Sequence, residues 1–268
     1  MSELIGNAIE KPFFFLGRNL LILSGHTKNW VSYLSEVCYA LVTPPLRRKE
    51  TLLQLYQIGV KSTPIIIFSV SFAAAVTVLE YTYHVNLVIH STALVPGFAA
   101  LLILRELGAV ITALLLTSRV GAGVASEVGS MQITEQIDAL KLLNIDPIRF
   151  LVVPRFWAGV FSCIALVIFA NSTCIFFTML LSIKYLSFSA GSFISSMNHF
   201  ASFKDFYLSL VKGAIYGGVI PVIGCYYGFN CKAGAEGVGK ATTQTVVSNA
   251  VVIILLDFIL TYLFSYLY

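Results

Sequence analysis

The stretch LRELGAVITALLLTSRVGAGVASEVGSMQITEQIDALKLLNIDPIRFLVVPRF, residues 104–156, decides the fold. It begins inside an apolar run that contains Arg105 and Glu106 side by side, and it leaves that run through a glycine-rich exit at residues 119–123. It then continues as a long, charge-bearing segment before the next apolar run begins. Because a membrane helix needs about 20 predominantly apolar residues, the pattern predicts two transmembrane spans joined by a structured loop.

Within this loop, residues 127–143 predict one short amphipathic helix. Ile133, Ile137 and Leu140 fall on one helical stripe, and the charged residues between them fall on the other faces. An amphipathic helix between two membrane spans needs a partner for its apolar stripe. We therefore expect another, soluble protein to act on the membrane domain here.

The composition identifies an all-α integral membrane protein. Of 268 residues, 57% are hydrophobic and 11% are charged, against about 25% charged in a typical soluble domain. So little charge cannot cover a globular surface, and lipid must cover much of it. The net charge of +4 does not indicate nucleic-acid binding, because the basic residues lie in loops between apolar runs. The five cysteines and four histidines form no pattern typical of a disulfide framework, a metal site or a catalytic site.

Five apolar runs predict membrane spans, with no internal repeat between them. The N-terminal residues 1–45 are apolar but interrupted by charges, so we expect an interfacial helix there, with a tilted span as the alternative and no cleavable signal peptide. Ser62, Thr63 and Pro64 predict a capped start for the first span. The predicted spans are residues 64–83, 93–118, 156–183, 207–229 and 246–268.

The distribution of lysine and arginine predicts the orientation. With the N-terminus in the cytosol and the C-terminus outside, the outer loops hold only Lys184 and Lys204. The inner segments then hold most of the 17 lysine and arginine residues, among them Arg47, Arg48, Lys49, Lys61, Arg119, Lys141, Arg149, Arg155, Lys232 and Lys240.

Charged residues inside the spans are the candidate functional groups. Arg105 and Glu106 are expected about 18 Å from either end of their span, where an ionised side chain costs about 2.5–3.5 kcal/mol. Adjacent helical residues point about 100° apart, so each needs its own partner. Lys212 and Asp257 are also deep, and Glu80 lies near the end of the first span. Either these groups form a structural network that fixes helix packing, or they form a polar floor or gate for an amphiphilic substrate.

Two glycine patterns favour structural roles. Gly213 and Gly217, four residues apart in the fourth span, are typical of close helix packing. The sequence from Gly234 to Lys240 resembles the start of a phosphate-binding loop, but Ala241 replaces the required Ser or Thr and a membrane span follows. We therefore do not expect this segment to bind ATP.

With these residues in view, the chain resembles the MlaE/YrbE family, the permease subunits of ABC transporters that work with MCE-domain lipid-binding proteins. The resemblance is most specific across residues 105–160, which include RELG and EQIDAL. It continues in GKATTQTVV (239–247), LLDFILT (255–261) and QLYQIGVKS (54–62). Lys240 and Gln244 stand where arginine is expected in some relatives.

The resemblance implies a phospholipid-transporting homodimer of five-span subunits with an N-terminal interfacial helix in a Gram-negative inner membrane. Two cytosolic ATPase subunits would lie on one side and periplasmic MCE-domain proteins on the other. The permease itself would have no catalytic residues, metal or cofactor, since ATP would bind to the ATPase subunits. Residues 127–143 would be the coupling helix that docks on the ATPase.

The resemblance also implies two sets of site residues. The implied lipid-binding residues, in an outward-facing pocket at the dimer interface, are Val76, Leu79, Tyr83, Leu102, Arg105, Glu106 and Asp257. The implied coupling residues are Glu127, Met131, Ile133, Glu135, Gln136, Ile137 and Leu140. A carrier or channel that works alone, or a membrane scaffold without a substrate, are the alternative functions.

Overall fold

The computed structural model describes residues 28–43, 47–89, 95–186, 188–232 and 234–267, and the chain divides into two compact units, residues 1–45 and 46–268. In the first unit, residues 28–42 form a helix. The earlier part of the predicted interfacial helix, residues 1–27, lies outside the described residues.

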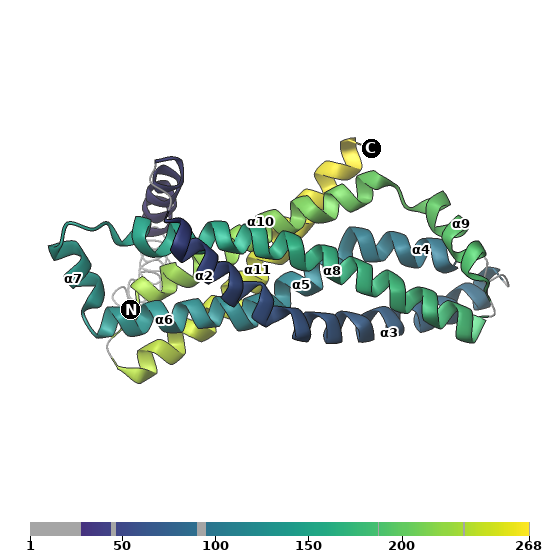
Figure 1. Cartoon of the computed structure of the whole chain (residues 1–268), viewed down its shortest axis with the longest axis horizontal. Helices are drawn as coiled ribbons and strands as arrows, with labels where there is room; N and C mark the ends of the chain where they lie inside the picture. The colour runs from purple at the N-terminus through teal and green to yellow at the C-terminus, as the bar shows by residue number, and fades with distance from the viewer. Residues whose placement is uncertain (1–27, 44–46, 90–94, 187, 233, 268) are drawn as a thin grey trace, which may run out of the picture. The chain divides into compact units, whose positions relative to one another are not determined.

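Every regular element described in the second unit is helical (Figure 1). The elements are α2 (Arg48–Ile58), η1 (Val60–Ser62), α3 (Thr63–Ile89), α4 (Val95–Leu102), η3 (Ile103–Leu107), α5 (Gly108–Leu116), η4 (Thr117–Gly121), α6 (Ala122–Ile133), α7 (Gln136–Leu142), η5 (Ile148–Val152), α8 (Val153–Leu186), α9 (Ala190–Phe200), α10 (Phe203–Phe229) and α11 (Ala235–Leu267). Within this unit, α7 and α9 lie at opposite ends of the helix bundle (Figure 1).

The five-span, all-α architecture predicted from the sequence is confirmed. Among the described residues, five helical stretches are long and apolar enough to cross a membrane. They are Arg48–Val85, Val95–Ile133, Ile148–Tyr185, Phe203–Phe229 and Ala235–Tyr266. Each overlaps one predicted span over nearly its whole length, and all five are longer than predicted because helical structure continues beyond the apolar core.

The first span does not begin with the predicted hydroxyl cap. The Ser62 hydroxyl donates a 2.5 Å hydrogen bond to the carbonyl of Ile58, and η1 leads directly into α3. Helical structure already starts at Arg48, so the backbone N–H groups near Ser62 belong to a continuing helix and need no cap. Only a short 3-10 turn after Gly59 separates α2 from α3.

The second span also differs from its prediction, because the glycine-rich exit remains helical. Gly121 lies at the end of η4 and Gly123 lies in α6. A Cβ atom on Gly121 would come within 2.9 Å of the Asn249 amide nitrogen, and one on Gly224 within 3.1 Å of the Gly121 carbonyl. Glycine therefore serves close helix packing at this position rather than termination.

Helix α10 forms the centre of the second unit. It packs against α8, α6, α5 and α11. In the most apolar stretch of α10, 72% of the residues are buried, compared with 11% in the most apolar stretch of α11. Gly217 permits close approach to α8, because a Cβ there would collide with the carbonyl of Gly159. The Gly213 and Gly217 pattern thus serves packing within the chain, as predicted.

Short polar segments set the remaining helix starts. The side chains of Ser202 and Asp205 form a reciprocal capping box at the start of α10, which therefore begins at Phe203 rather than at residue 207. The Ser189 hydroxyl accepts a 3.1 Å hydrogen bond from the backbone N–H of Ser192 and caps α9.

Candidate functional site

Arg105 and Glu106 lie on η3, a single π-helical turn inside the second span. Such turns interrupt the regular hydrogen-bond ladder and are frequent at functional sites. The pair lies about 15 Å from the Val95 end of the helix at the α-helical rise, and not at its middle, because the helix continues to Ile133. Lys212 and Asp257 lie at a similar distance, about 14 Å, from Phe203 and Tyr266 respectively.

Lys212 on α10 contacts most of the other charged residues at this depth. Its Nζ atom lies 2.6 Å from Oδ1 of Asp257 and 3.0 Å from Oε2 of Glu106. It also donates 2.8 Å hydrogen bonds to the Arg105 carbonyl and to the hydroxyl of Thr261. The ammonium group therefore joins the second, fourth and fifth spans, and its charge is fully compensated although the side chain is 0% exposed.

Arg105 has a separate partner. Its Nε atom donates a 2.6 Å hydrogen bond to Oδ1 of Asp205. The other oxygen of Asp205 accepts a 2.8 Å hydrogen bond from the backbone N–H of Ser202. One carboxylate thus caps α10 and holds the guanidinium. The sequence-based expectation that Arg105 and Glu106 each need their own partner is met by two different groups of α10.

We call Arg105, Glu106, Asp205, Lys212 and Asp257 the charge cluster. With all five ionised it has three negative and two positive charges, so one carboxylate charge exceeds the cations. Lys212 and Asp205 are buried, whereas the side chains of Arg105, Glu106 and Asp257 are 33%, 31% and 22% exposed. The cluster therefore has a closed inner side and an open outer side.

The implied lipid-binding residues fall into two groups in the single chain. Arg105, Glu106 and Asp257 come together in the charge cluster. Val76, Leu79 and Tyr83 lie exposed on α3, which packs mainly against α8, whereas Asp257 lies on α11, which packs mainly against α10 and α6. Leu102 is half-buried at the end of α4, directly before η3.

Sequence reasoning missed three polar groups of this site: Asp205, Tyr216 and Thr261. The Tyr216 hydroxyl donates a 2.9 Å hydrogen bond to Asp257, and the Thr261 hydroxyl donates a 3.2 Å hydrogen bond to Glu106. Helical spacing could have found them. Tyr216 follows Lys212 by one turn, Asp205 precedes it by two turns, and Thr261 follows Asp257 by one turn.

An apolar cavity adjoins the charge cluster. Its volume is about 730 Å³. It is lined by Leu104, Ile175, Met197, Asn198, Ala201, Ser202, Phe203 and Phe206. Leu104 precedes Arg105 and Ser202 contacts Asp205, so polar groups and an apolar space lie next to each other at this level.

The predicted coupling helix is wrong in its extent. Residues 127–133 belong to α6, the chain turns at Thr134 and Glu135, and α7 covers only Gln136–Leu142. Glu135 adopts a left-handed backbone conformation, with φ of 58°, which ends one helix and starts the next. Local amphipathic spacing continues across this turn and therefore could not reveal it.

The orientation of the predicted stripe also needs correction. Ile137 is only 2% exposed, so it faces the protein's own interior and not a soluble partner, and Leu140, Met131 and Ile133 are half-buried. Glu135 and Gln136 are exposed, as are Leu142 (89%) and Leu143 (70%). The apolar side chains available to a partner are therefore Leu142 and Leu143, at the end of α7.

Glu127 has an internal partner as well. Its Oε1 atom lies 2.9 Å from a guanidinium nitrogen of Arg155, whose side chain is 4% exposed. Since a buried guanidinium needs a counter-charge, Glu127 stabilises the junction between α6 and the start of α8. Any role in coupling would be additional to this ion pair.

The segment that resembles a phosphate-binding loop is helical in the structure. Gly239 and Lys240 lie within α11, where Lys240 pairs with Glu236 at 2.6 Å, so they are not part of a phosphate-binding loop. Within the described ranges, no three His, Cys, Asp or Glu side chains are arranged to hold a metal ion.

Comparison with known proteins gives consistent matches. The family model described as Permease MlaE matches residues 51–263. A probable ABC transporter permease protein of Rickettsia felis is 34% identical over 84% of this chain and 86% of its own length. The intermembrane phospholipid transport system permease protein MlaE of Haemophilus influenzae is 35% identical over 81% of this chain and 84% of its own. The chloroplastic protein TRIGALACTOSYLDIACYLGLYCEROL 1 of Arabidopsis thaliana is 31% identical over 85% of this chain and 65% of its own.

Proposed function

The chain belongs to the MlaE permease family, and from this premise we propose that it is the membrane subunit of an ABC transporter that moves phospholipid. The names of its Haemophilus and Rickettsia relatives support both parts of this proposal. The phospholipid would pass between a Gram-negative inner membrane and an MCE-domain lipid-binding protein in the periplasm.

The observation that carries the proposal is the open side of the charge cluster. Arg105, Glu106 and Asp257 are partly exposed, yet they lie on helices that are apolar enough to cross a membrane. Charged groups at this depth do not face acyl chains, but face other protein, water or lipid headgroups. The open side is therefore the wall of a polar compartment within the membrane.

A second copy of the chain would close this compartment. Around Asp257, α11 exposes large apolar side chains such as Ile254 and Phe258, and α3 exposes Val76, Leu79 and Tyr83. In a homodimer, α3 of one copy and α11 of the other could meet at the interface. The implied lipid-binding residues would then line one pocket, although in the single chain they lie on separate surfaces.

This arrangement suits an amphiphilic substrate. The exposed edges of the Arg105 guanidinium and the two carboxylates offer hydrogen bonds to a zwitterionic headgroup. The exposed apolar side chains of α3 and α11 would contact the acyl chains. Phospholipid binding needs no cofactor in this subunit, and ATP would bind and be hydrolysed in a separate ATPase.

The ATPase would dock at the α7 end of the bundle. Leu142 and Leu143 form an exposed apolar pair there, next to the charged residues Asp138 and Lys141. The basic residues of the loops favour the α7 end as the cytosolic end, with the N-terminus in the cytosol and the C-terminus in the periplasm. The α9 end would then face the MCE-domain protein.

The test is ATP-dependent transfer of a fluorescent phospholipid from proteoliposomes that contain the complex to an acceptor protein. Glu106→Gln removes one charge and keeps the size of the side chain. We expect it to slow transfer by about tenfold, which corresponds to about 1.4 kcal/mol, while the complex still assembles. The matched control is Glu236→Gln, because Glu236 is an exposed carboxylate at the start of α11, outside the charge cluster and the implied lipid-binding residues.

Two results would contradict the proposal. If Glu106→Gln transports at the wild-type rate, the charge cluster serves helix packing alone. If the chain transfers lipid without any ATPase subunit, it is a carrier that works alone.

A further inference from the structure

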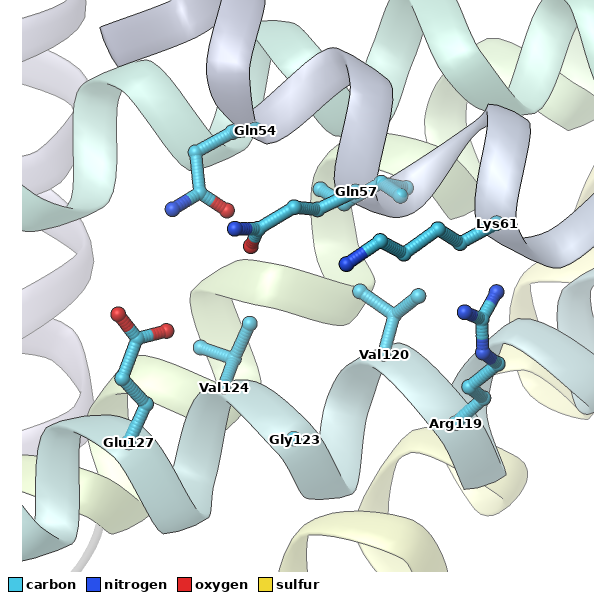
Figure 2. A pocket seen from close by; sticks show the side chains of 9 residues that line it. Gln54, Gln57, Lys61, Arg119, Val120, Gly123, Val124 and Glu127 are labelled. Atoms are coloured by element: carbon cyan, nitrogen blue, oxygen red, sulfur yellow. The ribbon is translucent and has the colours of Figure 1, made fainter.

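A second polar site lies at the α7 end, away from the charge cluster. It is a cavity of about 310 Å³ between α2 and η1 on one side and η4 and α6 on the other. Figure 2 shows the side chains of Gln54, Gln57 and Lys61 extending from the first side toward the second. Arg119, Val120, Val124 and Glu127 line the opposite wall.

Two cations in this cavity have no carboxylate partner among the residues that the structure describes. In the part of the chain that the structure describes, Lys61 forms no ion pair, and the guanidinium of Arg119 donates a 2.5 Å hydrogen bond to the neutral hydroxyl of Ser62. Glu127 is the only carboxylate in the lining, and its charge is compensated by the buried Arg155 at 2.9 Å. Positive charge is therefore in excess in the cavity.

Lys61 and Arg119 lie at the ends of uncharged, apolar helical stretches. From Thr63 to Leu79, α3 has no charged residue, and neither do residues 107–118 of the second span. Lys61 thus comes directly before one uncharged membrane stretch and Arg119 directly after the other, and both line the same cavity. Charged side chains at such positions lie at the level of the lipid headgroups.

We propose that this cavity binds a phosphate group at the membrane surface, with Lys61 and Arg119 as the cationic ligands and Gln54 and Gln57 as amide donors. The hydrogen bond from Arg119 to the Ser62 hydroxyl holds the guanidinium at the wall of the cavity. The source of the phosphate is either a phospholipid headgroup of the leaflet at the α7 end or a soluble phosphate. The inference depends on the proposed function only in that the α7 end is taken as a membrane surface.

A binding measurement tests the site. The full chain in detergent is titrated with dioleoylphosphatidylglycerol, with dioleoylglycerol, which lacks the phosphate, and with inorganic phosphate, and the bound molecules are counted by native mass spectrometry. Lys61→Gln is compared with Lys49→Gln, which removes an exposed charge from the same helical segment outside the cavity. We expect Lys61→Gln to weaken one phosphatidylglycerol site by about fivefold to tenfold, because a charge-assisted hydrogen bond is lost.

Lys49→Gln should bind phosphatidylglycerol like the wild type, and dioleoylglycerol should bind equally to all three proteins. A Lys61-dependent site for inorganic phosphate with no such site for phosphatidylglycerol would identify soluble phosphate as the ligand. Equal binding of both phosphate probes to wild type and Lys61→Gln would overturn the inference. That result would leave the proposed transport function intact, since Glu106→Gln tests it at the other site.

Discussion

At the scale of single residues, Lys212 has the most demanding position in the protein. Its ammonium is 0% exposed and compensates two carboxylates, Glu106 and Asp257, on two other helices. Removing one partner of a buried ion pair is costly because the remaining charge stays desolvated. Here two carboxylates would lose their common partner together.

Lys212→Met should therefore destabilise the protein by about 3–5 kcal/mol. The measurement is the thermal unfolding midpoint of the detergent-solubilised chain. Adding Glu106→Gln and Asp257→Asn to Lys212→Met should recover much of the loss, because no uncompensated charge then remains. If Lys212→Met unfolds at the wild-type temperature, the ammonium is not the counter-charge that holds these helices together.

The sequence revealed some of these residues and not others. Arg105, Glu106, Lys212 and Asp257 could be identified as deep charges, since an ionised residue inside an apolar run is conspicuous. Their pairing could not be predicted, because it depends on how three separate spans rotate and approach. Asp205 was overlooked because it lies at a helix end, where a carboxylate is common and usually only a cap.

At the scale of elements, α7 illustrates what amphipathic spacing can and cannot predict. The spacing of Ile133, Ile137 and Leu140 correctly indicates helical structure, but the turn at Glu135 and the burial of Ile137 reverse its interpretation. An apolar stripe packs either against a partner or against its own chain, and amphipathic spacing is the same in both cases. Leu142 and Leu143 are the large apolar residues that this segment exposes.

A pair of substitutions on α7 separates folding from coupling. Ile137→Asp should destabilise the α6–α7 junction by about 3 kcal/mol, because it places a carboxylate in a buried apolar position. Leu142→Asp should leave the thermal unfolding midpoint unchanged and reduce co-purification with the ATPase. The opposite pattern, with normal folding of Ile137→Asp and normal ATPase association of Leu142→Asp, would contradict this account of α7.

Glycines provide a second prediction at this scale. Gly217→Ala should destabilise the protein by about 1–3 kcal/mol, because its Cβ would collide with the backbone of α8 and force α8 and α10 apart. Gly239→Ala is the matched control, since its Cβ would meet nothing within 4 Å. This substitution should stabilise α11 by about 0.5–1 kcal/mol, because alanine favours the helix more than glycine does. Thermal unfolding of both variants gives the comparison. Equal midpoints would mean that α8 and α10 do not pack this closely.

At the scale of the whole molecule, the most informative feature is the contrast between α10 and α11. The central helix α10 is mostly buried, whereas α11 buries few of its apolar residues and exposes large ones such as Ile254 and Phe258 beside the charge cluster. The number of spans could be predicted from the sequence, because it follows from the lengths of apolar runs. The exposed face of α11 could not, since the burial of a helix depends on the neighbours that surround it.

Photocrosslinking at α11 tests the central claim most directly. A photoreactive phenylalanine analogue is placed at Phe258, which is 71% exposed beside Asp257, and at Phe176, which is 59% exposed on α8, as a control. After illumination in native membranes, the Phe258 position should crosslink both to a second copy of the chain and to phospholipid, while the Phe176 position should crosslink to lipid alone. If the Phe258 position never reaches a second copy, the charge cluster does not lie at a dimer interface and the proposed transport pocket does not exist.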